Sequence, residues 1–318
     1  MKIFITGVAG FIGFHLAKKL CDEGHYVYGI DNLDNYYDIS LKNCRLKILQ
    51  SSKKFSFIQT DLNDLQLIEE TFDLGINFAA QAGVRIPTKF HNKYEHSNVY
   101  GFKSFLNFCK QMKIKKIIYA SSSSVYSDKN REKFAEDTTE LFPKSVYGIS
   151  KLSNEKYADR YALENSLNIL GLRFFSVYGP WGRPDMAYYL FTDCLKNDKP
   201  ITLFNNGEMF RDMTYIDDII DGVISSIHYI SKKNDMCSHE VFNLGNNKPI
   251  STLEIIGEIK KHLKKEGEFI HKKSENEAYY THACIKKADK ILGYSPKTDF
   301  KEGITKFLKW YEQFNQER

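Results

Sequence analysis

Tyr147 and Lys151 lie four positions apart in the segment Tyr-Gly-Ile-Ser-Lys. On a helix, positions i and i+4 share a face, so the ammonium of Lys151 can lie near the phenol of Tyr147. A nearby positive charge favours the phenolate and lowers its pKa from the usual value of about 10. The spacing therefore predicts that Tyr147 is a base able to act near neutral pH. The alternative is a solvated pair on a helix surface, because helix-spaced pairs of these residues also recur by chance.

The N-terminal segment predicts a dinucleotide site. Residues 2–6 form a short apolar run typical of a buried strand, and Gly7, Gly10 and Gly13 follow it with the spacing GxxGxxG. The first glycine permits a tight turn, the second lets the backbone approach a pyrophosphate, and the third lets a helix expected over residues 11–23 pack on the strand. The N-terminus of that helix offers N–H groups to phosphates.

An acidic residue after the second expected strand indicates which dinucleotide binds. This strand covers residues 26–30, and Asp31 follows it, 18 residues after Gly13. A carboxylate there can accept hydrogen bonds from both hydroxyls of the adenosine ribose and repels a 2′-phosphate. We therefore expect NAD rather than NADP. A cationic nicotinamide beside Tyr147 would lower the pKa of the phenol further.

Apolar runs and amphipathic segments alternate through the first half of the chain. We expect further strands over residues 55–59, 75–79, 116–120 and 168–174, and helices over residues 64–72, 98–112 and 146–163. This alternation predicts an α/β fold of the Rossmann type, with a doubly wound parallel sheet that binds ligands at the carboxyl ends of its strands.

The pattern loosens after Phe175. Residues 178–184 and 205–207 are rich in turn-forming residues. We expect an NAD-binding domain over residues 1–175. Residues 176–318 should form mainly a smaller, interleaved substrate domain, with some segments returning to the first. In that half we expect helices over residues 219–227, 252–264 and 303–314, and a surface loop at the polar stretch near Lys272 and Lys273.

Composition excludes several classes of protein. The 318 residues are 42% hydrophobic and 27% charged, and 45 basic residues against 40 acidic ones give a net charge of only +5, without a basic block that would indicate nucleic acid. Six cysteines without a CxxC pair predict neither a disulfide framework nor a zinc site, and the histidines lack metal-ligand spacing. No apolar run approaches the roughly 20 residues that span a bilayer. We expect a cytoplasmic protein that binds no metal, membrane or nucleic acid.

Longer motifs are distributed along nearly the whole chain. They are TGVAGFIGFHLAKKL, GIDNLDNYYD, AAQAGVR, YASSSSVY, the YxxxK pair, LRFFSVYGPWGRPDMA, RDMTYIDDI and LGYSPKT. Together they resemble the extended short-chain dehydrogenase/reductase family, the NAD-dependent epimerases and dehydratases, and within it the UDP-glucuronate 4-epimerases. Ser176 departs from the usual Thr or Asn, and His282-Ala283-Cys284 departs from an aromatic-Ala-Asp sequence. Both departures border the substrate side.

The resemblance implies roles for individual residues. NAD would contact Gly7, Gly10, Phe11, Ile12, Gly13, Asp31, Asn32, Asp61, Leu62, Ala79, Ala80 and Lys151. The catalytic residues would be Tyr147, Lys151 and Ser122, with Ser123 as a neighbouring alternative to Ser122. The nucleotide sugar would contact Arg85, Ser122, Ser124, Tyr147, Ser176, Arg183 and Arg211, with Arg211 at the nucleotide phosphates.

The resemblance also implies a reaction, the 4-epimerisation of UDP-glucuronate to UDP-galacturonate. Inverting a secondary alcohol requires that its C–H bond break, and transient oxidation at C4 to a 4-keto intermediate achieves this. Tyr147 would remove the hydroxyl proton while a hydride passes from C4 to tightly bound NAD and later returns to the opposite face. Arg85 and Arg183 could hold the sugar carboxylate by bidentate bonds, although each could instead pair with a structural acid.

Other activities on the same scaffold remain alternatives. An epimerase, dehydratase or net oxidoreductase could act on another nucleotide sugar, and a non-catalytic NAD-sensing protein could keep the fold. Related decarboxylases and 4,6-dehydratases need an acidic residue directly after the Ser/Thr, where this chain has Ser123 and Ser124, which argues against both. The family likeness further implies a homodimer formed by the helices near residues 98–112 and 146–163. Phe102, Phe105, Leu106 and Cys109 would form its apolar face or face the sheet instead.

Overall fold

Seven parallel strands form the centre of the molecule. The computed structural model describes residues 1–84, 86–127, 132–139, 141–233, 237–273 and 278–316. The strand order is β10-β6-β5-β4-β1-β2-β3. The strands are β1 (Lys2–Thr6), β2 (Tyr26–Asp31), β3 (Phe55–Gln59), β4 (Leu74–Asn77), β5 (Lys116–Ser122), β6 (Asn168–Phe174) and β10 (Ser238–Leu244). Strands β1, β4 and β6 are almost entirely buried because helices cover both faces of the sheet, as is typical of parallel sheets. The predicted α/β Rossmann-type fold is confirmed.

The order of the strands reverses between β1 and β4. From β1 the chain proceeds to β2 and β3 on one side, and β4, β5 and β6 extend the sheet on the other. Loops leave the carboxyl ends of β1 and β4 in opposite directions at this point, which opens a crevice where ligands bind in such folds. Thr6 and Asn77 pair in register at this edge, and the Thr6 hydroxyl donates to Asn77 Oδ1 over 2.5 Å.

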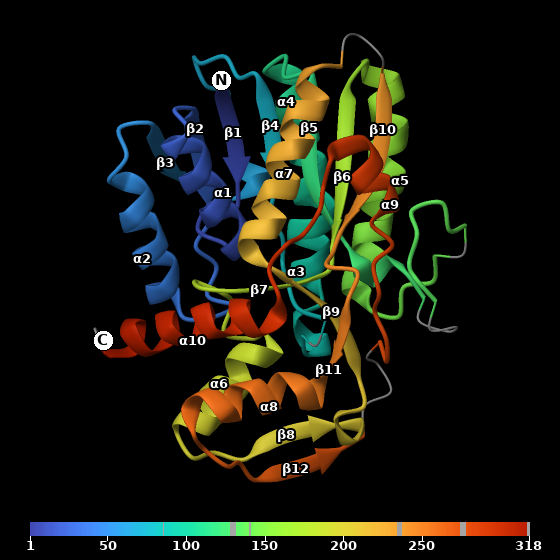
Figure 1. The fold of residues 1–318 in the computed structure, drawn as a ribbon. Coiled ribbons are helices and arrows are strands. Elements are labelled where there is room, and N and C mark those ends of the chain that lie inside the picture. The colour runs from blue at the N-terminus through green and yellow to red at the C-terminus, as the bar shows by residue number, and fades with distance from the viewer. Residues whose placement is uncertain (85, 128–131, 140, 234–236, 274–277, 317–318) are drawn as a thin grey trace.

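Two layers of helices cover the sheet (Figure 1). One apolar cluster unites α1 (Phe11–Asp22), α2 (Ile39–Gln50) and α7 (Ile216–Ser231) with one face. A second unites α4 (Gly101–Gln111) and α5 (Val146–Asn165) with the other. Phe102, Phe105, Leu106 and Cys109 are buried in that second cluster. They therefore face the sheet of their own chain, which is the second of the two alternatives that the sequence left open, and they do not form an apolar dimer face.

A smaller part lies at the carboxyl edge of the sheet, with α10 crossing between the two (Figure 1). Its strands form two small sheets, β11-β9-β7 and β12-β8. These strands are β7 (Ser176–Tyr178), β8 (Ile201–Phe204), β9 (Phe210–Tyr215), β11 (Pro249–Ser251) and β12 (Phe269–Lys272). The helices of the C-terminal half other than α7 are α6 (Ala187–Lys196), α8 (Thr252–Leu263), α9 (Lys286–Leu292) and α10 (Phe300–Gln316). Among the C-terminal strands, β10 returns to the large sheet and pairs with β6.

Some predicted elements differ from the structure. Residues 64–72 are not a helix: a single 3₁₀ turn, Leu62–Asp64, precedes a segment without regular secondary structure. Its apolar residues Leu65, Ile68 and Phe72 pack on the α4 cluster, so apolar residues at helix-like spacing are buried here without a helix. Lys272 ends strand β12 instead of lying in a loop. Helices α2 and α6 were not anticipated.

Short turns complete the chain. They are η2 (Thr88–Phe90), α3 (Asn92–Tyr94), η3 (Glu95–Tyr100), η4 (Ser123–Val125) and η5 (Asn205–Gly207). The segment η3 is a π-helix that leads directly into α4, where one α-helix was expected. Among the described residues, no helix combines the length and apolar character needed to cross a bilayer.

Candidate active site

A cavity of about 910 Å³ lies between the carboxyl edge of the large sheet and the smaller part. Its walls come from the loops after β1, β2, β4 and β5, the start of α5, and the segment from β7 into α6. Nearly all of the predicted site residues line it: Gly7, Gly10, Phe11, Ile12, Gly13, Asp31, Asn32, Asp61, Leu62, Ala79, Ala80, Ser122, Ser123, Ser124, Tyr147, Lys151, Ser176, Arg183 and Arg211. Arg85 falls outside the described residues.

The three N-terminal glycines differ in what surrounds them. A Cβ on Gly7, whose φ is +76°, would lie 2.6 Å from Ala79 N, and one on Gly13 would lie 2.1 Å from Gly7 O. These two glycines therefore let the loop after β1 approach β4 and α1 closely. A Cβ on Gly10 would meet only the backbone of Gly7, at 3.0 Å or more, so its open side faces the cavity.

The start of α1 fits the pyrophosphate of a dinucleotide. Gly10 is its N-cap, no side chain caps the helix, and its first turn contains no acid. Free N–H groups and the positive end of the helix dipole attract an anion at such a place. A backbone without a Cβ at Gly10 lets a phosphate approach. These residues fit the pyrophosphate of NAD. The nicotinamide would then lie in the part of the cavity that Tyr147 and Lys151 line.

Two carboxylates mark the opposite end from the catalytic residues. Asp31 Oδ2 accepts the N–H of Ala9 over 3.1 Å and Oδ1 accepts that of Leu33 over 2.8 Å. A carboxylate oxygen has a second lone pair, so each can also accept a ribose hydroxyl. Burial raises the pKa of Asp61, but hydrogen bonds from Asn63 and Asn32 and the charge of His96 lower it overall. Both acids are therefore suited to accept hydrogen bonds.

Tyr147 and Lys151 lie on one face of α5, as their spacing predicted. Ser145 caps this helix by accepting the Gly148 N–H over 3.0 Å. The Lys151 Nζ lies 5.7 Å from the centre of the Tyr147 ring and donates to Ala120 O at the end of β5 over 2.9 Å. Ser122, from that same strand, lines the cavity with Tyr147, and its hydroxyl accepts the Ser124 N–H over 3.1 Å.

The predicted direction of the Tyr147 pKa is wrong for the protein without ligands. Burial raises the pKa of Tyr147, and the charge of Arg183 and the hydrogen bond with Ser122 offset this only in part. Burial also lowers the pKa of Lys151 to about 8, against the opposing charge of Glu155. The neutral phenol of Tyr147 is favoured, and the ammonium of Lys151 loses its proton more easily than usual, because the protein alone solvates the phenolate and the ammonium poorly.

A buried network lies beneath this pair. Arg173 donates to both oxygens of Glu155, over 2.9 Å from Nε and 2.7 Å from Nη2, and the Ser121 hydroxyl donates to Glu155 Oε1. Glu155 lies one helical turn after Lys151, so its position could have been inferred from spacing. Asn98, on the π-helix η3, accepts from Gln81 N–H and donates to Ser150 Oγ. The network ties α5 to β5, β6 and η3.

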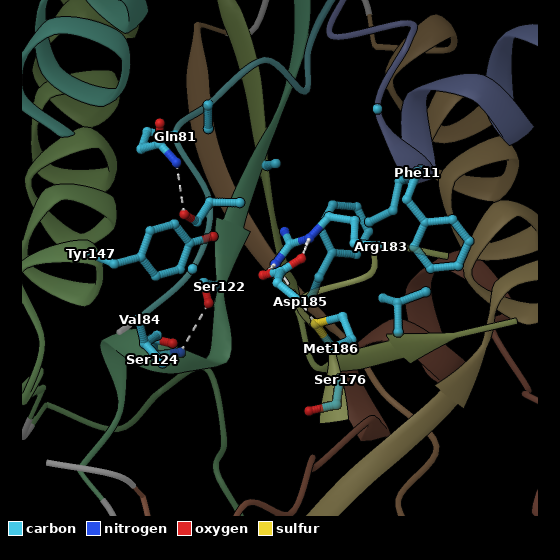
Figure 2. A pocket seen from close by; sticks show the side chains of 18 of the residues that line it. Phe11, Gln81, Val84, Ser122, Ser124, Tyr147, Ser176, Arg183, Asp185 and Met186 are labelled. Carbon is cyan, nitrogen blue, oxygen red and sulfur yellow. Dashed lines mark hydrogen bonds and ion pairs between the residues drawn. The ribbon is translucent and has the colours of Figure 1, made fainter. Parts of the chain in front are cut away.

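Arg183 and Asp185 form the opposite wall. Figure 2 shows Tyr147, Ser122 and Ser124 on one side of the cavity and Arg183, Asp185, Met186 and Ser176 on the other. Arg183 Nε and Nη2 donate to the two oxygens of Asp185 over 2.9 and 2.7 Å, and Tyr36 also donates to Asp185. The sequence left open whether Arg183 holds a sugar carboxylate or pairs with a structural acid. In the structure without ligands it pairs with Asp185. Asp185 was missed as a site residue.

A dinucleotide cradle connected to a Tyr–Lys–Ser group defines an NAD-dependent enzyme acting on an alcohol. The model of the NAD dependent epimerase/dehydratase family matches residues 3–245, and the chain belongs to that family. It is a nucleotide-sugar epimerase of this family, and its predicted cofactor, NAD, is confirmed at that level. Within the described residues, no group of three or more His, Cys, Asp or Glu could hold a metal ion.

Several relatives are similar over the full chain. The sequence is 37% identical to protein CapI of Staphylococcus aureus over 99% of both chains. It is 38% identical to UDP-glucuronate 4-epimerase 1 of Arabidopsis thaliana, covering 98% of this chain and 76% of that protein. The crystal structure of UDP-glucuronic acid 4-epimerase from Bacillus cereus, in complex with UDP-glucuronic acid and NAD, matches with a TM-score of 0.92 and 34% identity, covering 99% of this chain and 100% of that one.

Proposed function

We propose that this protein is a UDP-uronate 4-epimerase that interconverts UDP-glucuronate and UDP-galacturonate by transient oxidation at C4. The observation that carries the proposal is the position of Arg183 across the cavity from Tyr147 and Ser122 (Figure 2). A cation facing the reacting hydroxyl suits a sugar that bears a carboxylate next to C4. The relatives named for UDP-glucuronate add support.

The side of the cavity that carries Tyr147, Lys151 and Ser122, here called the catalytic wall, would carry out the proton transfer. Tyr147 takes the proton of the 4-hydroxyl as a phenolate, and Ser122 holds the sugar oxygen by a hydrogen bond. Bound NAD would supply the acceptor for the C4 hydride and the donor for its return. Burial raises the pKa of Tyr147. A cationic nicotinamide beside the ring would favour the phenolate, so the base would become active only once the cofactor is seated. Lys151 contributes a second positive charge on the same side, and Ser123 is the neighbouring alternative to Ser122.

The opposite wall would bind the sugar and its diphosphate. Arg183 would bind the C5 carboxylate, helped by Arg85, while Ser124 and Ser176 contact the sugar and Arg211 the phosphates. A 4-keto uronic acid is a β-keto acid, and it loses CO₂ when its carboxylate stands perpendicular to the carbonyl plane. A guanidinium that fixes the carboxylate in another orientation would prevent this loss.

One observation favours a second candidate, a 4-epimerase of a neutral UDP-sugar such as UDP-glucose. Both Nε and Nη2 of Arg183 already pair with Asp185, which cancels much of the positive charge on that wall. An uncharged hydroxymethyl group at C5 would fit beside such a neutral pair. A uronate must instead bind through Nη1 or share the guanidinium with Asp185.

Substrate specificity separates the two candidates. The purified protein is incubated in turn with UDP-glucuronate, UDP-galacturonate, UDP-glucose and UDP-N-acetylglucosamine, and the products are identified by NMR. The proposal predicts conversion between the two uronates only, with NAD bound to the purified protein and no net absorbance change at 340 nm. Conversion of UDP-glucose alone refutes it, and a lasting rise at 340 nm indicates a net oxidoreductase.

The proposal also covers the roles of the two domains and the formation of a homodimer. Residues 1–175 would hold NAD, and residues 176–318 would mainly hold the nucleotide sugar. The homodimer would use the outer surfaces of α4, α5 and the preceding η3, where Tyr100, Ile149 and Leu163 are 52%, 55% and 64% exposed. Light scattering after size exclusion tests this: Ile149→Lys should give monomers, and a monomeric parent protein would refute it.

A further inference from the structure

Arg45, on α2, is a fully buried cation that sequence reasoning did not single out. It is 0% exposed. Its Nη1 donates to Ala9 O and to the Tyr37 hydroxyl, each over 2.7 Å, and its Nη2 donates to Trp181 O over 2.6 Å and to Gly182 O over 3.3 Å. None of these acceptors is a carboxylate. One guanidinium thus joins the glycine-rich loop after β1 to the turn at residues 180–182, which immediately precedes Arg183.

A second side chain holds the same turn. His15, on α1, bonds through Nε2 to Pro180 O over 3.0 Å. Burial lowers the pKa of His15 to about 4, so the ring is neutral near pH 7. A carbonyl oxygen can only accept, so Nε2 carries the proton and Nδ1 does not. Three consecutive carbonyls, those of residues 180–182, therefore accept hydrogen bonds from helices α1 and α2.

The conformation of the turn needs such support. Trp181 has a φ of +60°, in the left-handed region that bulky residues rarely adopt. Its ring centre lies 5.6 Å from that of Phe14 and 5.3 Å from those of Trp310 and Phe314, so it packs between α1 and α10. A Cβ on Gly182 would lie 1.8 Å from the Tyr188 hydroxyl. The turn therefore has one close-packed arrangement, and strained backbone of this kind persists where its surroundings determine it.

The side chain of Arg183 is fixed from the same region. Asp185 holds two of its nitrogens, and Tyr36 donates to Asp185 Oδ2 over 3.2 Å. Tyr36 is adjacent to Tyr37, which accepts from Arg45. The loop after β2 and helix α2 thus position both the backbone before Arg183 and, through Asp185, its guanidinium.

A hydrophobic residue of the same volume would avoid the cost of burying a charge that no carboxylate balances. Arginine supplies what an apolar side chain lacks, a planar fork that spans carbonyls 36 and 136 residues away in sequence. These contacts suit a role in orientation better than one in stability.

We propose that Arg45, assisted by His15, is a positioning residue that holds the 180–182 turn against the glycine-rich loop and so places Arg183 for recognition of the sugar carboxylate. This inference rests on the proposed uronate specificity. It makes discrimination between a charged and a neutral sugar depend on a residue that contacts neither.

Binding to an inactive background tests this directly. Arg45→Lys, Arg45→Met and His15→Phe are each combined with Tyr147→Phe, and the dissociation constants of UDP-glucuronate and UDP-glucose are measured by calorimetry on the NAD-loaded protein. We expect Arg45→Lys to weaken UDP-glucuronate about tenfold, the order of one charge-assisted hydrogen bond, with UDP-glucose changed less than about twofold. His15→Phe should weaken UDP-glucuronate about threefold, since its bond is between neutral groups. Arg160→Met, an exposed arginine on α5, is the matched control and should change neither.

The outcomes separate the possible explanations. Equal weakening of both sugars, or a lower melting temperature with an unchanged ratio of dissociation constants, overturns the inference. If Arg45→Met does not fold, Arg45→Lys and His15→Phe still decide it. In the active background the same two variants should release more 4-keto pentose per turnover. If the parent protein does not epimerise UDP-glucuronate, the proposed function fails; if it does and the ratio is unmoved in the variants, only the role of Arg45 fails.

Discussion

The two walls of the cavity are built in different ways. The catalytic wall takes its reactive groups from two adjoining elements, β5 and α5, and holds them by a capped helix and by the buried Arg173–Glu155 pair. The wall that carries Arg183 and Asp185 is a turn-rich segment held from outside, by His15 and Arg45 of the first two helices and by Tyr36 of the loop after β2. Both walls are ordered, but only the first draws its order from short-range sequence spacing.

This difference assigns separate tasks to the walls. A base and its neighbouring cation must keep one fixed distance, which a single helical turn guarantees. A site that selects among sugars benefits from a loop, because loops can change without disturbing the sheet that positions the chemistry. Substitutions on the first wall should therefore affect turnover of every substrate, and those on the second should affect the choice of substrate.

The largest effect is expected from Tyr147→Phe. Removal of the phenol oxygen leaves the proton of the 4-hydroxyl without an acceptor, and we expect turnover to fall about 10³-fold, within the range of general acid–base catalysis. NAD should remain bound, since its cradle is separate. Turnover is measured by NMR, with Tyr157→Phe on the same helix as the control. Activity within about tenfold of the parent would remove the catalytic role of this wall.

Arg183→Ala should have a smaller and more selective effect. Loss of the guanidinium should lower kcat/KM for UDP-glucuronate about 10²-fold, the order of a bidentate charge-assisted contact, and increase the share of 4-keto pentose among the products. Arg183→Lys keeps the charge without the fork and should recover only part of this. Arg85→Ala is assayed alongside. Unchanged epimerisation in both alanine variants would refute carboxylate anchoring by arginine.

The smallest effect concerns the pH dependence of protein stability, and it depends on Lys151 of the catalytic wall. Burial lowers the pKa of Lys151 from 10.5 to about 8. Between these values the unfolded chain binds the proton that the folded protein releases, so the contribution of Lys151 to stability rises with pH from 8 to 10.5, by at most about 1.4 kcal/mol per pH unit. Below pH 8 its penalty is constant. Urea unfolding at pH 8 and pH 10 should show this rise for the parent relative to Lys151→Met.

The exposed Lys156 provides the control for that measurement, because it lies on the same helix. Lys156→Met should follow the parent across the pH range. If stability changes equally with pH for the parent and for Lys151→Met, the ammonium of Lys151 is solvated in the folded state. The claim that burial desolvates the catalytic wall would then be refuted.

Local patterns predicted much of the cavity lining. The strand predicted at residues 2–6 is β1, and the glycines after it, Asp31, Tyr147 and Lys151 all line one cavity. The helix expected at residues 64–72 is absent because a segment without regular secondary structure buries its apolar residues against the α4 cluster. The pKa of Tyr147 was predicted in the wrong direction because the charge of Lys151 was considered without the cost of desolvation.

The sequence by itself determined the class of fold, the glycine-rich loop after the first strand and the shared helix face of Tyr147 and Lys151, because each depends on a periodicity or a spacing of a few residues. The tertiary structure alone decided that Tyr36 donates to Asp185, 149 residues away, that Phe102 and Phe105 face their own sheet, and that Arg45 reaches the turn 136 residues away. These contacts join segments far apart in the chain. Nothing in the local order of residues specifies such partners, because they are selected by burial and by the hydrogen bonds that buried groups must make.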